Sequence, residues 1–455
     1  MEFKNLGDIV QTIQDNKQKT IIIKKHILTT NELLDIETAF TDNTCVTQLV
    51  FADCDLQPED GAILGRIVGR HPAIQVVALE CNCLGDQGIE DFCKSAIRSK
   101  TLYRLSFNEN DLTDNGVKSL RMLLMYGFLQ VLSLDDNPKL GSKGIHKLFA
   151  GLEWSHPLTK LHLDRCSITA EGAVVLAAYL RSNPYLKHLI LPNNPIGDAG
   201  ITAISKCLQH VEFLGVCSCR IGNLGAIMLG KAVEAPRKTH LYELDLGENQ
   251  ITHLGLALND KEGLAVSLAK NTILAALHLD ENKIGDKGAA AMAKLIGVTT
   301  SLEILDLSEN YITDNGSSVL AAALAGNASV TDFYLSGNQV RVATEAFANM
   351  LSQNVTLVCL DLADTGMDDY DAISFALALP NNHTLETLNL DINPLSDEIL
   401  RQINGYLSNK QSLDNSAQEN LDTEEEDDQD SSPSDLNKQY SVEVQDGLVI
   451  KARME

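Results

Sequence analysis

The stretch LEILDLSENYI, residues 302–312, decides the fold of this chain. Two of its leucines, Leu305 and Leu307, alternate with polar residues, which predicts a short strand with one apolar face. Asn310 follows three residues later, where its side chain can hydrogen-bond backbone groups that have left the strand. The same pattern, LxxLxLxxN/CxL, is found in LYELDLGENQI (241–251) and LAALHLDENKI (274–284).

This pattern recurs through most of the chain. Most steps between its Asn or Cys positions are 28 residues long, the shortest being 25 and the longest 33. Such a period predicts a solenoid of stacked units. Turn formers such as GDAG and GDKG, followed by Ala-rich and Leu-rich runs, predict one helix per unit. The Asn or Cys position is occupied by Cys54, Asn82, Asn110, Asn137, Cys166, Asn194, Cys219, Asn249, Asn282, Asn310, Asn338, Thr365 and Asn393.

These motifs resemble the leucine-rich repeats of the ribonuclease-inhibitor subtype, a family that includes the sensor regions of NOD-like receptors and the Ran GTPase-activating proteins. The resemblance covers about residues 20–408. It implies an α/β horseshoe of about 13–14 repeats, mostly of 28 residues, with a parallel sheet on the concave side and helices on the convex side. It implies little about function, because this scaffold hosts many activities.

Three regions are expected along the chain. Residues 1–44 are predicted to form an N-terminal cap with a degenerate first repeat, and residues 45–408 to form the solenoid. Residues 409–455 form an acidic tail that we expect to be disordered. Within it, YSVEVQDGLVIKA (440–452) alternates around Asp446-Gly447, which leaves a hairpin open as the alternative.

Composition excludes several classes of partner. A net charge of −26 and a pI near 4.7 disfavour nucleic acid and anionic membranes. The N-terminus lacks a signal-peptide pattern, and the ten cysteines lack a CxxC pair, so we expect a cytoplasmic protein with reduced thiols. We therefore interpret the sequons at Asn315, Asn327, Asn354 and Asn382 as chance matches.

One motif imitates a phosphate-binding loop. Gly225 to Lys231 has its spacing, but Ala232 stands where a Mg²⁺-binding hydroxyl is needed. The same Gly-to-Lys spacing occurs in Gly200 to Lys206 and Gly288 to Lys294, so we interpret it as part of the repeat.

Catalytic and metal-binding motifs are also missing. His162 and His188 fall on adjacent predicted strands near Asp164, where a shared metal is conceivable, but a solvated surface pair is the preferred interpretation. We therefore expect no catalytic residue, cofactor or metal.

The stronger signal is an acidic band on the concave face. Because the leucines point inward, carboxylates at the alternate positions of successive strands should lie side by side, about 4.8 Å apart. The alternative is an acidic surface that only keeps the solenoid soluble. Bases cluster in the N-terminal half at Arg104, Lys160, Arg165 and Lys187. The predicted partner-binding residues are Tyr242, Glu243, Asp245, Glu248, His278, Asp280, Glu281, Asp306, Glu309, Asp332, Tyr334 and Asp361.

The sequence thus favours a non-enzymatic scaffold that binds a protein partner with a basic surface. One alternative is a GTPase-activating protein resembling the Ran activators, for which no catalytic residue can be assigned. Another is a bacterial effector translocated into the host cytosol to bind a host protein, suggested by the acidic block around Glu424–Glu426. The oligomeric state stays open.

Overall fold

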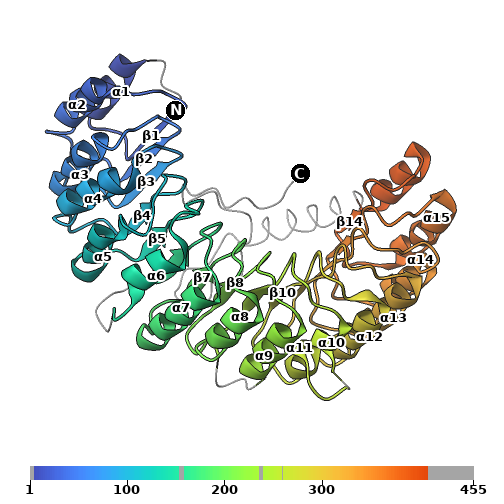
Figure 1. Cartoon of the computed structure of the whole chain (residues 1–455). Helices are drawn as coiled ribbons and strands as arrows, with labels where there is room; N and C mark the ends of the chain where they lie inside the picture. Colours follow the sequence, from blue (N-terminus) through green and yellow to red (C-terminus); the bar gives the residue numbers. More distant parts are fainter. Residues whose placement is uncertain (1–4, 153–157, 235–238, 259, 408–455) are drawn as a thin grey trace, which may run out of the picture.

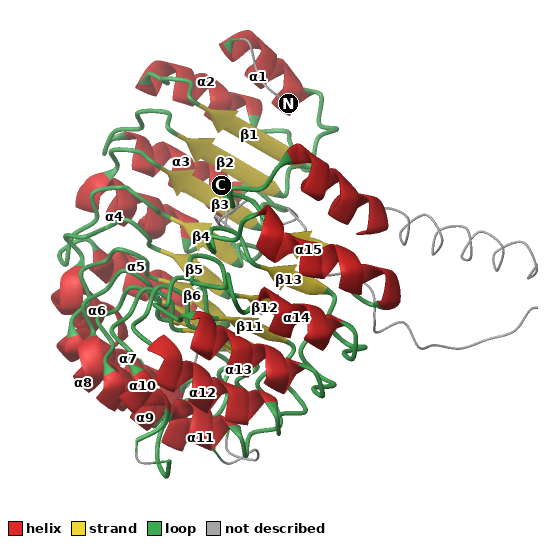
Figure 2. Cartoon of the chain, turned by 90° about the vertical axis from the view of Figure 1, so that its right-hand side faces the viewer, coloured by secondary structure: helices red, strands yellow, loops and turns green. Residues whose placement is uncertain are grey.

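The computed structural model describes residues 5–152, 158–234, 239–258 and 260–407, which form one curved solenoid (Figure 1). Every strand pairs in parallel with the next strand in sequence, so the sheet order follows the chain. The sheet lines the inner side and the helices cover the outer side (Figure 2). The horseshoe predicted from the repeats is confirmed. The predicted tail lies outside the described residues.

The sheet has fourteen strands within the described residues. They are β1 (Thr20–Lys24), β2 (Gln48–Ala52), β3 (Val76–Glu80), β4 (Arg104–Ser106), β5 (Val131–Ser133), β6 (Lys160–His162), β7 (His188–Ile190), β8 (Phe213–Gly215), β9 (Glu243–Asp245), β10 (Ala276–His278), β11 (Ile304–Asp306), β12 (Asp332–Tyr334), β13 (Cys359–Asp361) and β14 (Thr387–Asn389).

One helical segment follows each strand. The helices are α1 (Leu6–Gln14), α2 (Thr30–Ala39), α3 (Asp60–Arg70), α4 (Gly85–Ala96), α5 (Val117–Tyr126), α6 (Gly141–Phe149), α7 (Ala170–Ser182), α8 (Gly197–Ser205), α9 (Asn223–Val233), α10 (His253–Leu256), α11 (Leu264–Leu268), α12 (Gly285–Ile296), α13 (Asp314–Leu324), α14 (Thr344–Leu351) and α15 (Asp369–Ala378), followed by η1 (Leu379–Asn381) and a helical stretch at 397–407.

The alternating leucines hold the layers together. Leu244, Leu277 and Leu305 are in register on β9, β10 and β11, and each is fully buried. Burying one such side chain contributes roughly 1.5–3 kcal/mol, so the repeated leucines stabilise the array layer by layer. Their in-register burial turns the alternate residues of each strand toward the concave side.

The Asn or Cys positions form the predicted ladder of buried hydrogen bonds. Asn194 Nδ2 donates to Leu163 O (2.6 Å) in the preceding repeat and to Leu191 O (3.0 Å) in its own repeat. Its Oδ1 accepts from the backbone N–H groups of Cys166 (3.1 Å) and Ile168 (2.8 Å). The cysteine at position 166 fills the same place with a weaker donor, its Sγ lying 3.1 Å from Leu134 O. The ladder therefore satisfies the backbone where each strand ends.

A second ladder, which the sequence did not reveal, runs along the loops that lead from helix to strand. Asn327 Oδ1 accepts from the N–H groups of Ser329 (2.9 Å) and Val330 (2.7 Å), and its Nδ2 donates to Ile296 O (2.7 Å). Three of the sequon asparagines, Asn327, Asn354 and Asn382, occupy this position and are buried. Their side-chain amides donate hydrogen bonds to backbone carbonyls of the protein. The position is held by Asn43, His71, Ser99, Asn183, Asn271, Thr299, Asn327, Asn354 and Asn382.

The contacts of the first and ninth helices, α1 and α9, concern two points of the sequence interpretation. Ile9 and Ile13 of α1 are fully buried against the first layer. The N–H groups of Gly222 and Gly225 at the start of α9 donate to Asp198 Oδ1, at 2.6 and 3.0 Å. These amides therefore bind a side chain of the preceding repeat, and the glycine is part of the repeat.

The longest repeat carries its extra residues on the helical side. There the helix is divided into α10 and α11, and the connecting turn contains Gly263 at φ 142°. A Cβ at Gly263 would lie 2.1 Å from Leu256 O, so only glycine fits this turn. The insertion leaves the register between β9 and β10 intact.

Candidate functional site

The predicted acidic residues share the concave side of strands β9 to β13. Sheet register places Asp245, His278, Asp306, Tyr334 and Asp361 side by side along one row. All five are partly exposed. The sequences of these strands, ELD, ALH, ILD, DFY and CLD, contain no lysine or arginine. We call this half of the concave face, on strands β9 to β13, the acidic row. Apart from the imidazole of His278, these strands carry no basic side chain.

The aspartates of the acidic row also have a local role. Asp245 Oδ1 accepts from Gly247 N–H (3.0 Å), and Asp306 Oδ1 accepts from Ser308 N–H (2.9 Å). Asp361 repeats this bond with Ala363 N–H (2.9 Å). Each bond fixes the carboxylate at the end of its strand and leaves other lone pairs for a ligand.

Burial and crowding make these carboxylates hard to ionise. Burial raises the pKa of Asp280 to about 7, and the nearby charges of Asp306 and Asp245 reinforce the shift. The pKa values of Asp245 and Asp306 are also raised, again chiefly by burial. A cation placed among them would relieve this repulsion.

His278 is the one imidazole within the row. Its Nε2 lies 3.7 Å from Glu243 Oε1, and the register places it between Asp245 and Asp306. Burial opposes its charged form, but the three carboxylates outweigh that effect and raise the pKa of His278 above its usual value. As pH falls, the imidazole gains positive charge and therefore offsets part of the negative charge of the acidic row.

A glycine just beyond the end of the neighbouring strand β9 makes room for Asp280. A Cβ at Gly247 would lie 2.6 Å from Asp280 Oδ1 and 3.0 Å from its Cγ. Any larger residue would have to displace the carboxylate, since contacts this short are not tolerated. Gly247 thus positions an acidic side chain, a role that the repeat pattern did not indicate.

The other predicted site residues lie at the margins of the row. Asp332 is on β12, where Thr331 Oγ1 donates to its Oδ2 (2.6 Å), and Tyr242 directly precedes β9. Glu248, Glu281 and Glu309 lie beyond the strands, at the turn before each ladder asparagine, with φ of 52°, 50° and 52°. They therefore line the edge where the strands end, whereas Glu243 and Asp361 lie on the sheet face.

An aromatic patch adjoins the acidic row and was not predicted. The rings of His188 and Phe213 stack with centroids 6.0 Å apart. Next to them, the sheet register places Gly215 between Ile190 and Asp245. Because glycine has no side chain, none stands between these two residues on the concave side. Burial lowers the pKa of His188, so this ring is mostly neutral at pH 7. The patch offers an apolar contact beside the carboxylates.

The preferred interpretation of His162 and His188 as a solvated pair is wrong in one respect. Both are partly buried, and they are offset by two residues in the register. Burial, followed by the charges of Arg104 and Lys160, lowers the pKa of His162 to about 4. Across the described residues, no group of three or more His, Cys, Asp or Glu side chains is arranged to hold a metal ion.

The basic residues of the N-terminal half are partly neutralised. Arg165 Nη1 lies 2.9 Å from Asp164 Oδ2 and also pairs with Asp136. Lys187 Nζ lies 2.9 Å from Glu212 Oε1. Arg165 and Lys187 are thus paired with carboxylates of their own half of the face.

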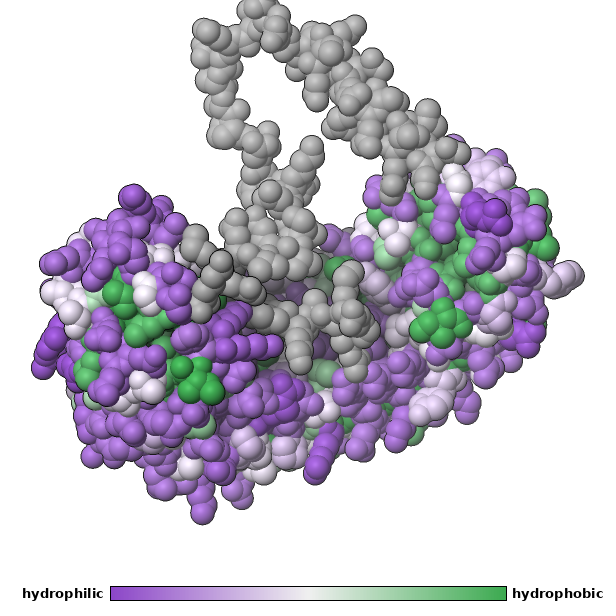
Figure 3. Space-filling model, turned by 90° about the horizontal axis from the view of Figure 1, so that it is seen from above, coloured by the Kyte–Doolittle hydropathy of each residue, from purple (hydrophilic) through white to green (hydrophobic). Residues whose placement is uncertain are grey.

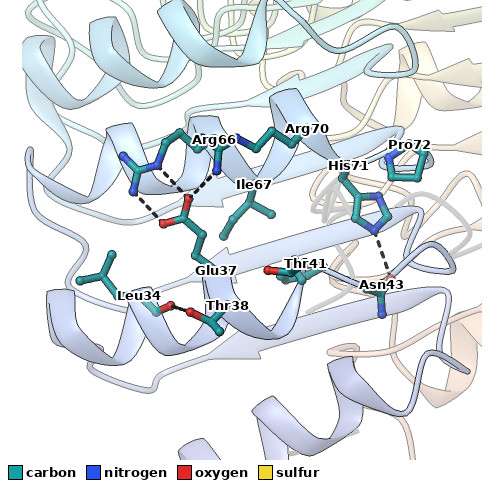
Figure 4. A pocket seen from close by; sticks show the side chains of 11 residues that line it. Leu34, Glu37, Thr38, Thr41, Asn43, Arg66, Ile67, Arg70, His71 and Pro72 are labelled. Carbon is teal, nitrogen blue, oxygen red and sulfur yellow. Dashed lines mark hydrogen bonds and ion pairs between the residues drawn. The ribbon is translucent and has the colours of Figure 1, made fainter.

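A pocket of about 430 Å³ opens on the helical side, between α2 and α3 (Figure 4). Glu37 pairs with Arg66 through two bonds of 2.8 and 2.7 Å and lies 3.6 Å from Arg70. His71 Nε2 lies 3.1 Å from Asn43 Oδ1. These charged and polar groups already bind one another, so we consider the pocket a weaker candidate binding site than the acidic row.

In the described part of the chain, no helix is both long enough and apolar enough to cross a bilayer.

Comparisons with known proteins agree with this architecture. A leucine-rich repeat family model matches residues 98–120, 155–177, 182–205, 270–293, 299–321 and 381–403. The pig (Sus scrofa) ribonuclease inhibitor is 28% identical over 396 residues, covering 78% of this chain and 85% of the relative. The human (Homo sapiens) NACHT, LRR and PYD domains-containing protein 5 is 27% identical over 269 residues, covering 52% of this chain but 22% of the relative.

Among solved structures, the TLR13–ssRNA13 complex aligns with a TM-score of 0.50 at 16% identity, covering 85% of this chain and 52% of that one. This likeness concerns the fold alone. The repeats, the family model and the relatives above assign the family without it: the chain is a leucine-rich repeat protein whose repeats are of the ribonuclease-inhibitor and NACHT-LRR type.

Proposed function

We propose that this protein is a non-enzymatic scaffold that binds a basic protein surface along the acidic row, with the aromatic patch as an adjoining apolar contact. The observation that carries the proposal is the sheet register, which aligns Asp245, Asp306 and Asp361 on alternate strands of β9 to β13, with Glu243 beside Asp245 and no lysine or arginine on any of these strands. Carboxylates crowded in a concave surface attract and orient a cationic partner.

The row favours one arrangement of the partner. A lysine or arginine inserted near Asp280 would stabilise a carboxylate whose pKa is held at about 7 by burial and by its acidic neighbours. An apolar side chain elsewhere on the same partner would contact the His188–Phe213 stack, which lies on β7 and β8, beyond β9 from Asp280. We therefore expect a partner in which basic residues flank at least one exposed apolar residue.

A ribonuclease is the first defined partner to test, because the pig relative is named a ribonuclease inhibitor. An enzyme that acts on a polyanion needs a cationic active site, which would suit the acidic row. For this chain the match is a proposal, since the two sequences are 28% identical.

The test compares the full chain with the triple variant Asp245→Asn, Asp280→Asn and Asp306→Asn. A matched control, Glu171→Gln, Glu345→Gln and Glu398→Gln, removes the same charge from exposed helical positions. Binding to a basic ribonuclease and to proteins of a cytosolic lysate is measured at low and high salt. We expect the triple variant to bind at least about 10-fold more weakly and the control to bind normally.

A folded triple variant that retains full affinity for every captured partner would refute the acidic row as the binding surface. A partner lost from both variants equally would assign the effect to net charge.

The two alternatives raised by the sequence remain hypotheses. GTP hydrolysis by small GTPases, measured with and without the protein, tests the GTPase-activating role. Delivery of a reporter fusion into host cells tests the effector role. The described residues supply no observation that favours either over the scaffold.

A further inference from the structure

The helical side of the solenoid is open between α2 and α3. An added Cβ at Gly61, Gly65 or Gly69 would collide with a backbone oxygen of α4, so these glycines let α3 lie directly against the next helix. Toward α2, by contrast, α3 presents the long side chains of Arg66 and Arg70. The pocket of about 430 Å³ lies on this second side, where the two helices do not close on each other.

Arg70 is the exception among the charged groups of this pocket. Glu37 already accepts hydrogen bonds from Arg66 with both of its carboxylate oxygens. Arg70 Nη1 lies 3.6 Å from Glu37 Oε1, beyond hydrogen-bond distance, although Figure 4 shows both guanidinium groups directed toward this carboxylate. No other acidic side chain in the described part of the chain pairs with Arg70, and its side chain is 70% exposed.

The pocket therefore differs in charge from the rest of the molecule. Its lining contains two arginines and one carboxylate, and burial lowers the pKa of His71, so this imidazole adds little charge at pH 7. The whole chain, by contrast, carries a net charge of −26. At physiological salt a charge is felt over about 8 Å. The acidic row, which begins at β9, is too far along the sheet to cancel the excess positive charge.

Apolar side chains lie beside the two arginines. Ile67 and Phe40 line the pocket and are buried, whereas Leu34 lines it and is 41% exposed. Seen from above, the N-terminal end of the solenoid is mostly hydrophilic, with apolar residues in separate patches, on the left of Figure 3. A ligand in this pocket would therefore combine a charge-assisted hydrogen bond with local apolar contact.

We propose that this pocket binds an acidic segment of a second partner protein. An Asp or Glu carboxylate of that segment would accept hydrogen bonds from Arg70, and a nearby apolar side chain would pack against Leu34. A guanidinium suits this role because its parallel N–H groups match the two oxygens of a carboxylate. The scaffold would then hold an acidic partner on its helical side and a basic partner on its concave side.

The next repeat supplies a matched arginine that does not line the pocket. Arg98 follows Arg70 by 28 residues, is also exposed and also directly precedes a residue of the second ladder. It stands at the end of α4, the helix that α3 contacts through its glycines. If exposed positive charge alone attracted acidic segments, the two arginines would therefore act alike.

The experiment measures binding of short acetylated and amidated peptides to the full chain by titration calorimetry. Each peptide carries one glutamate and one leucine in a Gly-Ser background, at spacings from adjacent to one helical turn, and each has a glutamine counterpart. We expect one spacing to bind with a Kd below about 1 mM. Arg70→Gln should weaken it about 10-fold, Leu34→Ala about 3-fold and Arg98→Gln not at all.

Two further readouts separate this site from the acidic row and from misfolding. Arg70→Gln should leave the binding of a basic ribonuclease unchanged, since that partner is expected on the concave side. Its Tm should also stay close to that of the parent, because the Arg70 side chain is exposed.

Four results would overturn the proposal. The first is that no peptide binds below about 1 mM. The second is equal affinity for the glutamate and glutamine peptides, which would show that no carboxylate is recognised. The third is an equal loss in Arg98→Gln and Arg70→Gln, which would assign the effect to positive charge alone. The fourth is self-association that Arg70→Gln abolishes, which would identify a second copy of this acidic chain as the occupant.

Discussion

His278 Nε2 lies 3.7 Å from Glu243 Oε1 across β9 and β10, while its backbone is in register with Asp245 and Asp306. One imidazole is thus surrounded by carboxylates on both neighbouring strands. Since the pKa of His278 is raised and that of Asp280 is about 7, the charge of the acidic row changes near neutral pH.

This arrangement predicts pH-dependent binding of a basic partner. Lowering the pH from 8 to 6 protonates Asp280 and adds positive charge at His278, so the row becomes less negative and affinity should fall by about 10-fold. Titration calorimetry across this range measures the change. The double variant Asp280→Asn/His278→Gln should show a much smaller pH dependence, and an unchanged one would contradict this explanation.

Stability should respond to Asp280 in the opposite direction. The pKa of Asp280 is about 7 in the folded state, whereas an unperturbed aspartate has a pKa near 3.9. Between about pH 4 and pH 7, Asp280 is therefore protonated in the folded state but ionised in the unfolded state. The stability from this group is complete at pH 4 and lost as pH rises through 7. We expect Asp280→Asn to raise Tm by roughly 2–4 °C at pH 8 and not at pH 4. Asp391→Asn, an exposed counterpart, should leave both values unchanged.

The contact between Gly247 and Asp280 gives a second test of the row. Gly247→Ala should cost about 1–3 kcal/mol in unfolding free energy because the new Cβ would lie 2.6 Å from the carboxylate. Adding Asp280→Ala should restore most of that loss, since the obstructing group is gone. Chemical denaturation of the single and double variants measures the coupling, and additive costs would show that the two residues do not interact.

The second ladder predicts different effects for two asparagines of one repeat. Asn354 Oδ1 accepts from Thr356 N–H (2.8 Å) and Leu357 N–H (2.7 Å), whereas Asn349 is exposed on α14. Asn354→Ala should lower unfolding free energy by about 3 kcal/mol, because it leaves buried amides without an acceptor. Asn349→Ala, its control, should change it by less than about 0.5 kcal/mol. Equal effects in urea denaturation would count against the ladder.

His71 makes the second ladder sensitive to acid at one repeat. Its Nδ1 accepts from the N–H groups of Ala73 and Ile74, each at 3.2 Å, and burial lowers its pKa. Because the unfolded imidazole binds a proton more readily, stability from this group falls as pH drops below about 6.5.

His71→Asn keeps an acceptor at this position and cannot titrate, so it should reduce the loss of Tm between pH 7 and pH 5. The exposed His146→Gln is the control and should retain the parental loss. If the Tm of His71→Asn falls between pH 7 and pH 5 as steeply as the Tm of the parent, another group causes the acid sensitivity.

The sequence alone determined the architecture of this protein. The spacing of Leu305, Leu307 and Asn310, repeated with a period near 28, was sufficient because each unit contacts mainly its neighbours. A local pattern in such an array therefore fixes which side chains are buried, which atoms bond the next repeat and which carboxylates share the concave side.

Only the tertiary structure decided how those residues act on one another. Register between strands placed His278 among carboxylates that are distant in sequence, and Gly247 mattered because of an atom 33 residues away. The second ladder stayed hidden because Asn43, His71 and Ser99 are chemically different residues that share one backbone geometry. A single sequence shows residue identity and spacing, but burial, register and the resulting pKa shifts depend on how the layers stack.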